Sequence, residues 1–219
     1  MALTFWRWII ALALISPVVA PRLWAQREAL RRHWRPIAVL GLLGGGVHNV
    51  LQYWGLHYTS AANGAILTSL VPVYVMLMGA ALHRERLTVP SAVGALISIA
   101  GVLALVFQLE WDALLAFRLN PGDGLIILSH LMIGGYTLGL RRRPAGLDSL
   151  SFLACFALVA LVPVGFAYLV ELSLGARITV TPASMAGLLY VAIFPALLAY
   201  HFWNLGVAAV GPTRGAMFF

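Results

Sequence analysis

The chain has 219 residues, of which 62% are hydrophobic and only 10% are charged, and its formal net charge at pH 7 is +7. A soluble domain of this length needs far more polar surface, so the composition excludes a soluble globular protein and indicates a polytopic membrane protein. The positive charge does not indicate a nucleic-acid partner, because the arginines lie in short segments between apolar stretches and act there as topology signals. A single cysteine, Cys155, excludes an intramolecular disulfide.

Seven stretches of the sequence are long and apolar enough to cross a membrane. A helix that spans the hydrocarbon core needs about 20 predominantly apolar residues. The seven predicted spans, in chain order, are residues 4–21, 37–56, 63–83, 89–108, 123–141, 149–170 and 184–206. An eighth apolar stretch begins at Gly215 and stops with the chain.

Arginine concentrates in every second connection between these spans, at residues 22–35, 84–86 and 141–143. Cytoplasmic loops of membrane proteins carry an excess of Lys and Arg, so we expect these connections to be cytoplasmic. The N-terminus then starts outside, and the region around residue 214 returns inside. The expected location is a cell membrane, the bacterial inner membrane in particular, crossed by several spans.

The second half of the chain echoes the first. Trp-Gly-Leu at 54–56, followed by Gly-Ala at 64–65, resembles Trp-Asn-Leu at 203–205, followed by Gly-Ala at 215–216. An internal repeat in a membrane protein is typical of transporters, because two related halves can rock about a site at their interface.

The arginine pattern gives these two halves opposite orientations. The helix at 37–56 is expected to run from inside to outside, whereas its counterpart at 184–206 runs from outside to inside. Inversion requires an odd number of helices per repeat. We therefore predict an all-α membrane bundle of two inverted five-helix units, the first at 1–108 and the second at 109–219. Ten helices would complete such a pair, so the first unit is expected to lack its first helix and the second unit its last two.

Residues 51–106 resemble the EamA domain of the drug/metabolite transporter superfamily. The matching features are a turn, a proline kink, a charged loop and a glycine-spaced helix, at Tyr58-Thr59-Ser60-Ala61, Pro72, Glu85-Arg86-Leu87 and Gly94 to Gly101. Residues 205–219 resemble the same element of a second EamA domain. The resemblance implies a ten-helix transporter that exports metabolites. Amino acids are a frequent substrate class in this family, and some relatives export aromatic amino acids.

The helix at 37–56 carries the clearest candidate for a binding face. At about 100° per residue, its polar and aromatic side chains fall on one arc, at His48, Asn49, Gln52 and Tyr53. Polar groups are costly inside a membrane and usually face a cavity or a partner helix. We expect this face to contact a solute. The alternative, that these side chains only bond to neighbouring helices, stays open.

The repeat mate at 184–206 offers a second polar and aromatic face, at Tyr200, His201, Trp203 and Asn204. When the two tryptophans are aligned, His201 corresponds to Gln52 across the pseudo-two-fold axis. Two equivalent helices that both point such groups inward predict a central substrate site between the repeats.

Two further spans contribute candidate contacts. The helix at 123–141 carries His130 and Tyr136, although His130 could equally be a satisfied packing histidine. The helix at 63–83 carries Thr68, although Ser and Thr in membrane helices often bond back to their own helix.

Two negative observations complete the sequence reading. Gly41, Gly44, Gly45 and Gly46 lack the loop-to-helix context of a phosphate site, so we interpret them as points of close helix approach. All acidic residues lie in connections or at span ends. Proton coupling would therefore depend on buried histidines or on groups in the missing helices, and simple facilitated export is the alternative.

Together these features predict a transporter that exports small organic metabolites by alternating access through a central cavity. Its aromatic and amide lining favours amino acids or related solutes, aromatic ones included. The alternatives are an intramembrane enzyme, which would need a catalytic dyad or closely spaced metal ligands, and a channel, which would need charged rings or a carbonyl filter. We predict no catalytic residue, metal or cofactor. The expected partners are a small-molecule substrate and the lipid bilayer, without nucleic acid, and the sequence leaves the oligomeric state open.

Overall fold

The protein is helical throughout the part of the chain that the structure describes. This computed structural model describes residues 1–84, 89–107, 120–144, 146–178 and 180–218, and every regular element within these ranges is a helix. The charged loop expected at residues 85–87 lies outside the described residues. The all-α class predicted from the sequence is confirmed.

Four helical segments make up the first half and coincide with the first four predicted spans. They are α1 (Ala2–Ala25), followed by the short α2 (Arg27–Arg32), then α3 (Trp34–Gly41) with the π-helix η1 (Leu42–Val47) and α4 (His48–Tyr58), then α5 (Ala61–Ser69) with α6 (Val71–His83), and α7 (Val89–Phe107). The bend between α5 and α6 falls at Leu70, two residues before the predicted kink at Pro72.

In the described part of the second half there are three segments and a short terminal helix, again at the predicted positions. They are α9 (Pro121–Gly139) with the 3-10 turn η2 (Leu140–Arg142), α10 (Ser149–Ser173), then α11 (Pro182–Val191) with the π-helix η3 (Ala192–Ala199) and α12 (Tyr200–Val210), and α13 (Pro212–Ala216). Within the described residues, five helices are long and apolar enough to cross a membrane, at Ala2–Ala25, Ala61–Leu82, Pro121–Arg142, Ser149–Ser173 and Pro182–Val210. The segment from α3 to α4 is of similar length but carries several polar side chains.

Polar caps fix where several helices begin. Ser60, Asn120, Asp148 and Thr181 each precede a helix, and their side chains accept hydrogen bonds from backbone N–H groups of the first turn. Such caps satisfy donors that have no partner inside the helix. At α9 the carboxylate of Asp123 also reaches back to the N–H of Asn120, which completes a capping box.

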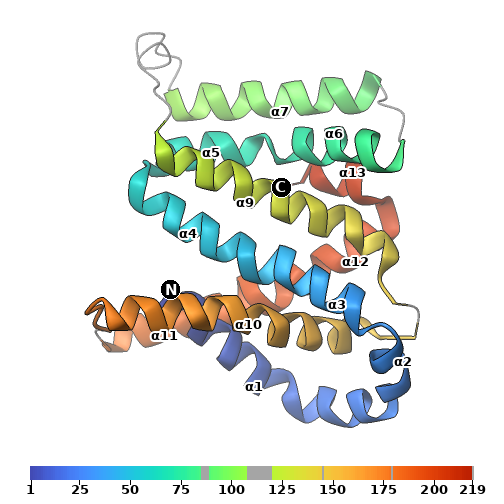
Figure 1. Cartoon of the computed structure of the whole chain (residues 1–219). Helices are drawn as coiled ribbons and strands as arrows, with labels where there is room; N and C mark the ends of the chain where they lie inside the picture. The colour runs from blue at the N-terminus through green and yellow to red at the C-terminus, as the bar shows by residue number, and fades with distance from the viewer. Residues whose placement is uncertain (85–88, 108–119, 145, 179, 219) are drawn as a thin grey trace.

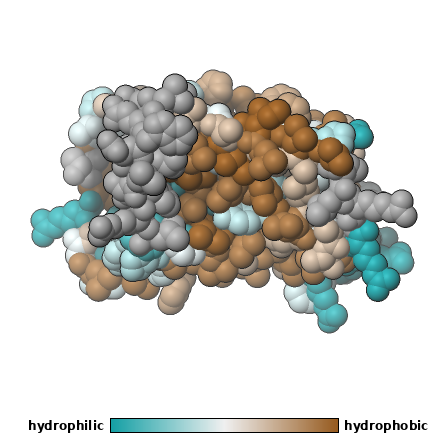
Figure 2. Space-filling view, turned by 90° about the horizontal axis from the view of Figure 1, so that it is seen from above, coloured by the Kyte–Doolittle hydropathy of each residue, from teal (hydrophilic) through white to brown (hydrophobic). Residues whose placement is uncertain are grey.

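The helices lie roughly side by side, with α9 between α4 and the α5–α6 pair (Figure 1). Figure 1 also shows that the α3–α4 segment and the α11–α12 segment run in opposite directions, as the predicted inversion requires. On the face seen in Figure 2, hydrophobic side chains form a broad band and hydrophilic side chains gather at the two ends. This pattern matches helices that cross an apolar layer between two aqueous phases.

The glycines of the second segment allow it to pack closely against its neighbours. A Cβ atom on Gly44 would lie 2.5 Å from the ring of Tyr136 on α9, and one on Gly45 would lie 2.7 Å from Ala160 on α10. Gly41 and Gly46 face α10 in the same way, since a Cβ atom on either would lie 2.7 or 2.5 Å, respectively, from a side chain of that helix. The interpretation of these glycines as points of close helix approach is confirmed.

An aromatic cluster forms the core where α1, α9, α10 and α12 meet. The ring centroid of Phe156 lies 5.7 Å from that of Trp8, 5.2 Å from that of Tyr136 and 5.2 Å from that of Tyr200. Trp8, Tyr136 and Phe156 are fully buried. Because aromatic pairs at these separations attract each other beyond simple area burial, the cluster fixes the spacing of four helices around one point.

Both repeat mates contain a π-helical segment directly before their polar residues. When Trp54 is aligned with Trp203, residues 42–47 of η1 correspond to residues 191–196, which overlap η3. Pro195 lacks an N–H group, which loosens the helix within η3. Segments of π-helix are rare and often occur at functional sites, where they change the direction of the side chains that follow.

Candidate functional site

A pocket lies where the two repeat mates meet. Its volume is approximately 170 Å³. It is lined by residues from η1–α4, α9 and η3–α12, namely His48, Ile133, Pro195, Ala199, Tyr200 and Trp203. Three of the predicted site residues, His48, Tyr200 and Trp203, therefore come together around one cavity, although His48 and Tyr200 lie on helices far apart in sequence.

His48 is held in place by Ser129 of α9. The Nδ1 atom of His48 lies 2.8 Å from the Ser129 hydroxyl, which is also 3.0 Å from Oε1 of Gln52. One serine thus links two predicted site residues on α4. Ser129 lies seven residues before Tyr136 on the same helical stripe of α9.

Asn49 faces a different neighbour, the buried arginine of α1. The Arg7 guanidinium donates to Oδ1 of Asn49 at 2.7 Å, and Nδ2 of Asn49 donates to the backbone carbonyl of Gly45 at 2.6 Å. Arg7 is only 8% exposed, and among the described residues no carboxylate forms an ion pair with it. An intramembrane arginine with no counter-ion marks a functional site by default, because a buried charge is costly unless something neutralises it.

Tyrosine hydroxyls connect α12 to the first repeat and to α9. Tyr200 donates to the backbone carbonyl of Gly44 at 2.9 Å. Tyr136 donates to Oδ1 of Asn204, and both of these residues are buried. The predicted residues Tyr136, Tyr200 and Asn204 thus form one hydrogen-bonded and aromatic contact region, in which the rings of Tyr136 and Tyr200 lie 6.3 Å apart.

Thr68 and His130 meet beside this region without lining the pocket. The Thr68 hydroxyl donates to the carbonyl of Gly64 at 2.8 Å, which is the back-bonding considered from the sequence, and lies 3.3 Å from Nε2 of His130. His130 is 1% exposed and its ring stacks near Tyr74 at 6.3 Å. Both residues remain predicted contacts.

Tyr53 and His201 are two further predicted residues that do not line the pocket. Both are half-buried, and neither is among the residues that line the cavity. The His201 ring lies against Phe202 at 5.7 Å, and its Nδ1 atom has no hydrogen-bond partner within the described residues. Their part in binding stays a prediction.

A buried carboxylate that the sequence did not single out lies at the other end of α9. Asp123 is 1% exposed and accepts hydrogen bonds from the Thr59 hydroxyl at 2.5 Å, from Nδ2 of Asn63 at 3.2 Å and from the N–H of Asn120 at 2.8 Å. This cluster joins the turn between α4 and α5 to the start of α9. The Asn-Pro-Gly-Asp sequence at 120–123 is a capping signal that could have indicated it.

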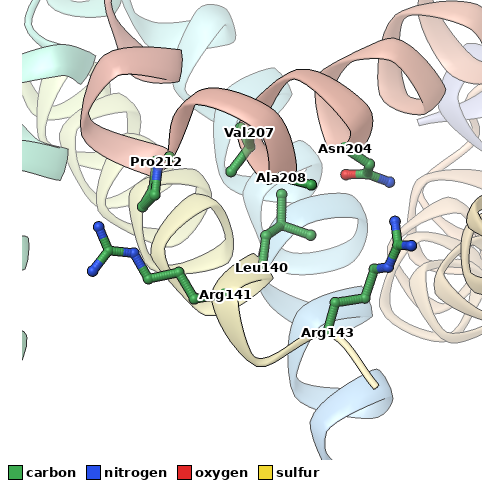
Figure 3. A pocket seen from close by; sticks show the side chains of 8 residues that line it. Leu140, Arg141, Arg143, Asn204, Val207, Ala208 and Pro212 are labelled. Carbon is green, nitrogen blue, oxygen red and sulfur yellow. The ribbon is translucent and has the colours of Figure 1, made fainter. Parts of the chain in front are cut away.

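A second, larger pocket opens at the end of the bundle that carries η2 and the turn between α12 and α13 (Figure 3). Its volume is approximately 390 Å³. The lining residues are Leu140, Arg141, Arg143, Asn204, Val207, Ala208, Gly211 and Pro212. Asn204 therefore reaches this pocket rather than the smaller one.

These features define a multi-pass helical membrane protein with polar groups and small cavities in its interior. Residues 1–107 match the EamA-like transporter family. This match and the transporter relatives confirm the resemblance to EamA-type drug/metabolite transporters found in the sequence.

Individual relatives agree with this assignment. The chain is 24% identical over 217 residues to an uncharacterized transporter, YyaM, of Bacillus subtilis, covering 98% of this chain and 70% of the relative. It is 26% identical to a probable terminal-alkyne amino-acid exporter of Streptantibioticus cattleyicolor, covering 78% of this chain and 56% of that protein. A crystal structure of another protein, 21% identical, superimposes with a TM-score of 0.70 over 98% of this chain and 74% of that one, which supports the fold.

Proposed function

We propose that this transporter exports small organic metabolites, amino acids or related solutes with aromatic ones included, by alternating access through a central cavity. The observation that carries the proposal is the pocket between the two repeat mates, with His48, Tyr200 and Trp203 in its wall. In transporters built from inverted repeats, substrates bind near the membrane midplane at the interface between the repeats.

The two repeats would be the units at 1–108 and 109–219, which rock against each other about this pocket. The family match at residues 1–107 supports the first unit. The opposite directions of α3–α4 and α11–α12 support the inverted relation on which rocking depends. We place the arginine-rich connections in the cytoplasm and the bundle in the bacterial inner membrane, in accord with the positive-inside rule.

The chemistry around the pocket favours a small zwitterion. Its volume, approximately 170 Å³, lies below the range of about 300–1,000 Å³ typical of pockets for drug-sized ligands. Tyr200 and Trp203 offer aromatic surfaces for an apolar side chain. Arg7, buried and hydrogen-bonded to Asn49 close behind Tyr200, supplies a positive charge that attracts a carboxylate. The name of the Streptantibioticus relative, an amino-acid exporter, supports the same substrate class.

Counterflow in reconstituted vesicles tests the proposal. Vesicles that contain the purified protein are loaded with unlabelled amino acids, with labelled phenylalanine outside, and the initial rate of exchange is compared between variants. We expect Trp203→Ala, which removes an aromatic wall of the pocket, and His201→Ala to lower the rate by about tenfold each. A tenfold change corresponds to about 1.4 kcal/mol, within the range of one aromatic contact or one hydrogen bond.

Phe202→Ala is the matched control, because Phe202 neighbours His201 but is 63% exposed on the outer surface of α12. It should leave the rate unchanged. Size-exclusion profiles and thermal unfolding establish that each variant is folded. Unaltered exchange in both Trp203→Ala and His201→Ala would refute the proposed site. Absence of exchange for every amino acid tested with the unmodified protein would refute this substrate class.

A further inference from the structure

The larger pocket is lined by positive charge and by unpaired hydrogen-bond donors. Its described lining contains two guanidinium groups, of Arg141 and Arg143, and no carboxylate. The remaining lining consists of small or apolar residues and the Asn204 amide. A cavity of approximately 390 Å³ with this composition suits an anion better than a cation or an apolar ligand.

Two of the donors are buried and lack an acceptor. Asn204 is 1% exposed, its Oδ1 atom accepts from the Tyr136 hydroxyl, and its Nδ2 atom has no hydrogen-bond partner within the described residues. The Nη1 atom of Arg143 is likewise buried without a partner in the described part of the chain. Buried donors in folded proteins are nearly always satisfied, so two unsatisfied donors at one cavity indicate an acceptor supplied by a ligand.

The surroundings hold these donors in place. The Arg143 guanidinium lies 5.9 Å from the centre of the Phe152 ring, and Phe152 is fully buried in the core. In Figure 3 the guanidinium group of Arg143 extends toward the side of the pocket that carries the Asn204 amide. A guanidinium and an amide N–H aimed at one space match the oxygens of a carboxylate or a phosphate.

We propose that this pocket is an anion-binding site at the cytoplasmic mouth of the transporter, where the carboxylate of a solute is captured before it reaches the central pocket. This role rests on the proposed function, which places η2 and the α12–α13 turn on the cytoplasmic side. Tyr136 connects the two places, because its hydroxyl contacts Asn204 of the mouth and its ring lies 6.3 Å from that of Tyr200, which lines the central pocket. An anionic lipid headgroup offers the same oxygen chemistry and is the other source of a ligand.

Equilibrium binding of a matched pair of probes tests the anion site. Benzoate and benzamide have nearly the same shape and differ in charge, and their affinities are measured by calorimetry with the full chain in phosphatidylcholine nanodiscs. We expect benzoate to bind more tightly than benzamide. Arg143→Gln should weaken benzoate binding by about tenfold, as expected for the loss of a charge-assisted hydrogen bond, and should leave benzamide binding unchanged.

Arg142→Gln is the matched control, because it removes the same charge from the same turn but Arg142 is exposed and does not line the pocket. Asn204→Asp is a second variant of the same shape, which still accepts from Tyr136 and should repel benzoate. Equal benzoate affinities in Arg143→Gln and Arg142→Gln, or equal affinities for benzoate and benzamide in the unmodified protein, would overturn the anion site.

Nanodiscs that contain phosphatidylglycerol distinguish the two sources of anion. Weaker benzoate binding in these nanodiscs, with the difference lost in Arg143→Gln, assigns the pocket to a lipid headgroup. Unchanged benzoate binding assigns it to a solute carboxylate. Because this readout is binding rather than flux, benzoate binding without amino-acid exchange would refute the proposed export while the anion site stands.

Discussion

The two repeat mates occupy equivalent places in the sequence but are held very differently. The η1–α4 segment packs its glycines against α9 and α10, and its polar side chains are tied to Arg7, Ser129 and backbone carbonyls. The segment that contains η3 and α12 is mostly exposed, since only 11% of the most apolar stretch within Pro182–Val210 is buried. Two of its polar side chains, His201 and Asn204, keep buried atoms without partners among the described residues.

This difference indicates that polar groups of the two segments have different roles, some in supporting the fold and others in binding a ligand. Donors and acceptors that already bond to the protein stabilise the fold but have little left for a ligand, whereas unpaired ones can be satisfied by a ligand. We therefore expect the first mate to serve mainly as a rigid wall and the second mate to present most of the groups that meet the solute. Variants on the first mate should therefore affect stability most, and variants on the second should affect transport most.

The largest expected effect on stability comes from a methyl group added at Gly44. Its Cβ would lie 2.5 Å from the ring of Tyr136, which cannot retreat because Phe156 packs against it and Asn204 accepts from its hydroxyl. Gly44→Ala should reduce the free energy of unfolding by about 1–3 kcal/mol, the usual cost of overpacking. Thermal unfolding in detergent measures the loss.

Gly206 on α12 supplies the matched control, because a Cβ atom there meets nothing within 4 Å. Gly206→Ala should be neutral or stabilising by up to about 1 kcal/mol, through the better helix propensity of alanine. Comparable losses from Gly44→Ala and Gly206→Ala would contradict the contrast between the two mates.

A somewhat smaller effect is expected from Ser129→Ala, which removes the hydroxyl between His48 and Gln52. The buried imidazole and amide then lack this partner, and the free energy of unfolding should fall by about 1–2 kcal/mol. His201→Ala on the opposite mate should cost less than about 0.5 kcal/mol, because Nδ1 of His201 makes no hydrogen bond within the described chain. Chemical unfolding curves for the two variants, set beside their exchange rates, show whether stability and transport separate as expected.

Hydropathy was sufficient to predict the helices, and the loop arginines predicted that the two mates run in opposite directions. The seven predicted spans coincide with helical segments because a membrane helix must be apolar over its whole length, and that signal is local. The π-helices were not predictable in this way. A π-helix forms where a helix can accommodate one extra residue, and this depends on how the helix packs against its neighbours. The sequence shows Gly44 and Pro195, but their effect becomes visible only when the positions of Tyr136 and the adjoining helices are known.

The candidate site was predictable in part for the same reason. The repeat alignment identified the two equivalent helices that carry His48, Tyr200 and Trp203, and these three residues line one pocket. The partners of these residues could not be read from the sequence, since Ser129 lies 81 residues from His48 and Asn49 lies 42 residues from Arg7. Such pairs depend on the rotation of each helix about its own axis, which side-chain packing decides.

A smaller effect than that of Ser129→Ala is expected at the support on which the first mate rests. Asp148 caps α10, the helix that packs against η1, and accepts hydrogen bonds from the Ser151 hydroxyl at 2.5 Å and from Nε2 of Gln26 at 2.9 Å. Partial burial alone would raise the pKa of Asp148, but the hydrogen bonds from Ser151, Gln26 and the backbone N–H of Leu150 outweigh it. They lower the pKa from 3.8 to about 2.

Because the pKa is lower in the folded state, this carboxylate contributes stability above its ordinary pKa of 3.8, and the contribution is lost as the pH falls through about 2. Asp148→Ala should cost about 1 kcal/mol at neutral pH, as for other N-caps, and should flatten the stability profile over that acidic range. Asp148→Asn keeps an N-cap acceptor but does not titrate, so it should retain most of the stability and lose the pH dependence. If Asp148→Asn keeps the acid sensitivity of the unmodified protein, other carboxylates set it, and the start of α10 is not the anchor of the tightly packed half.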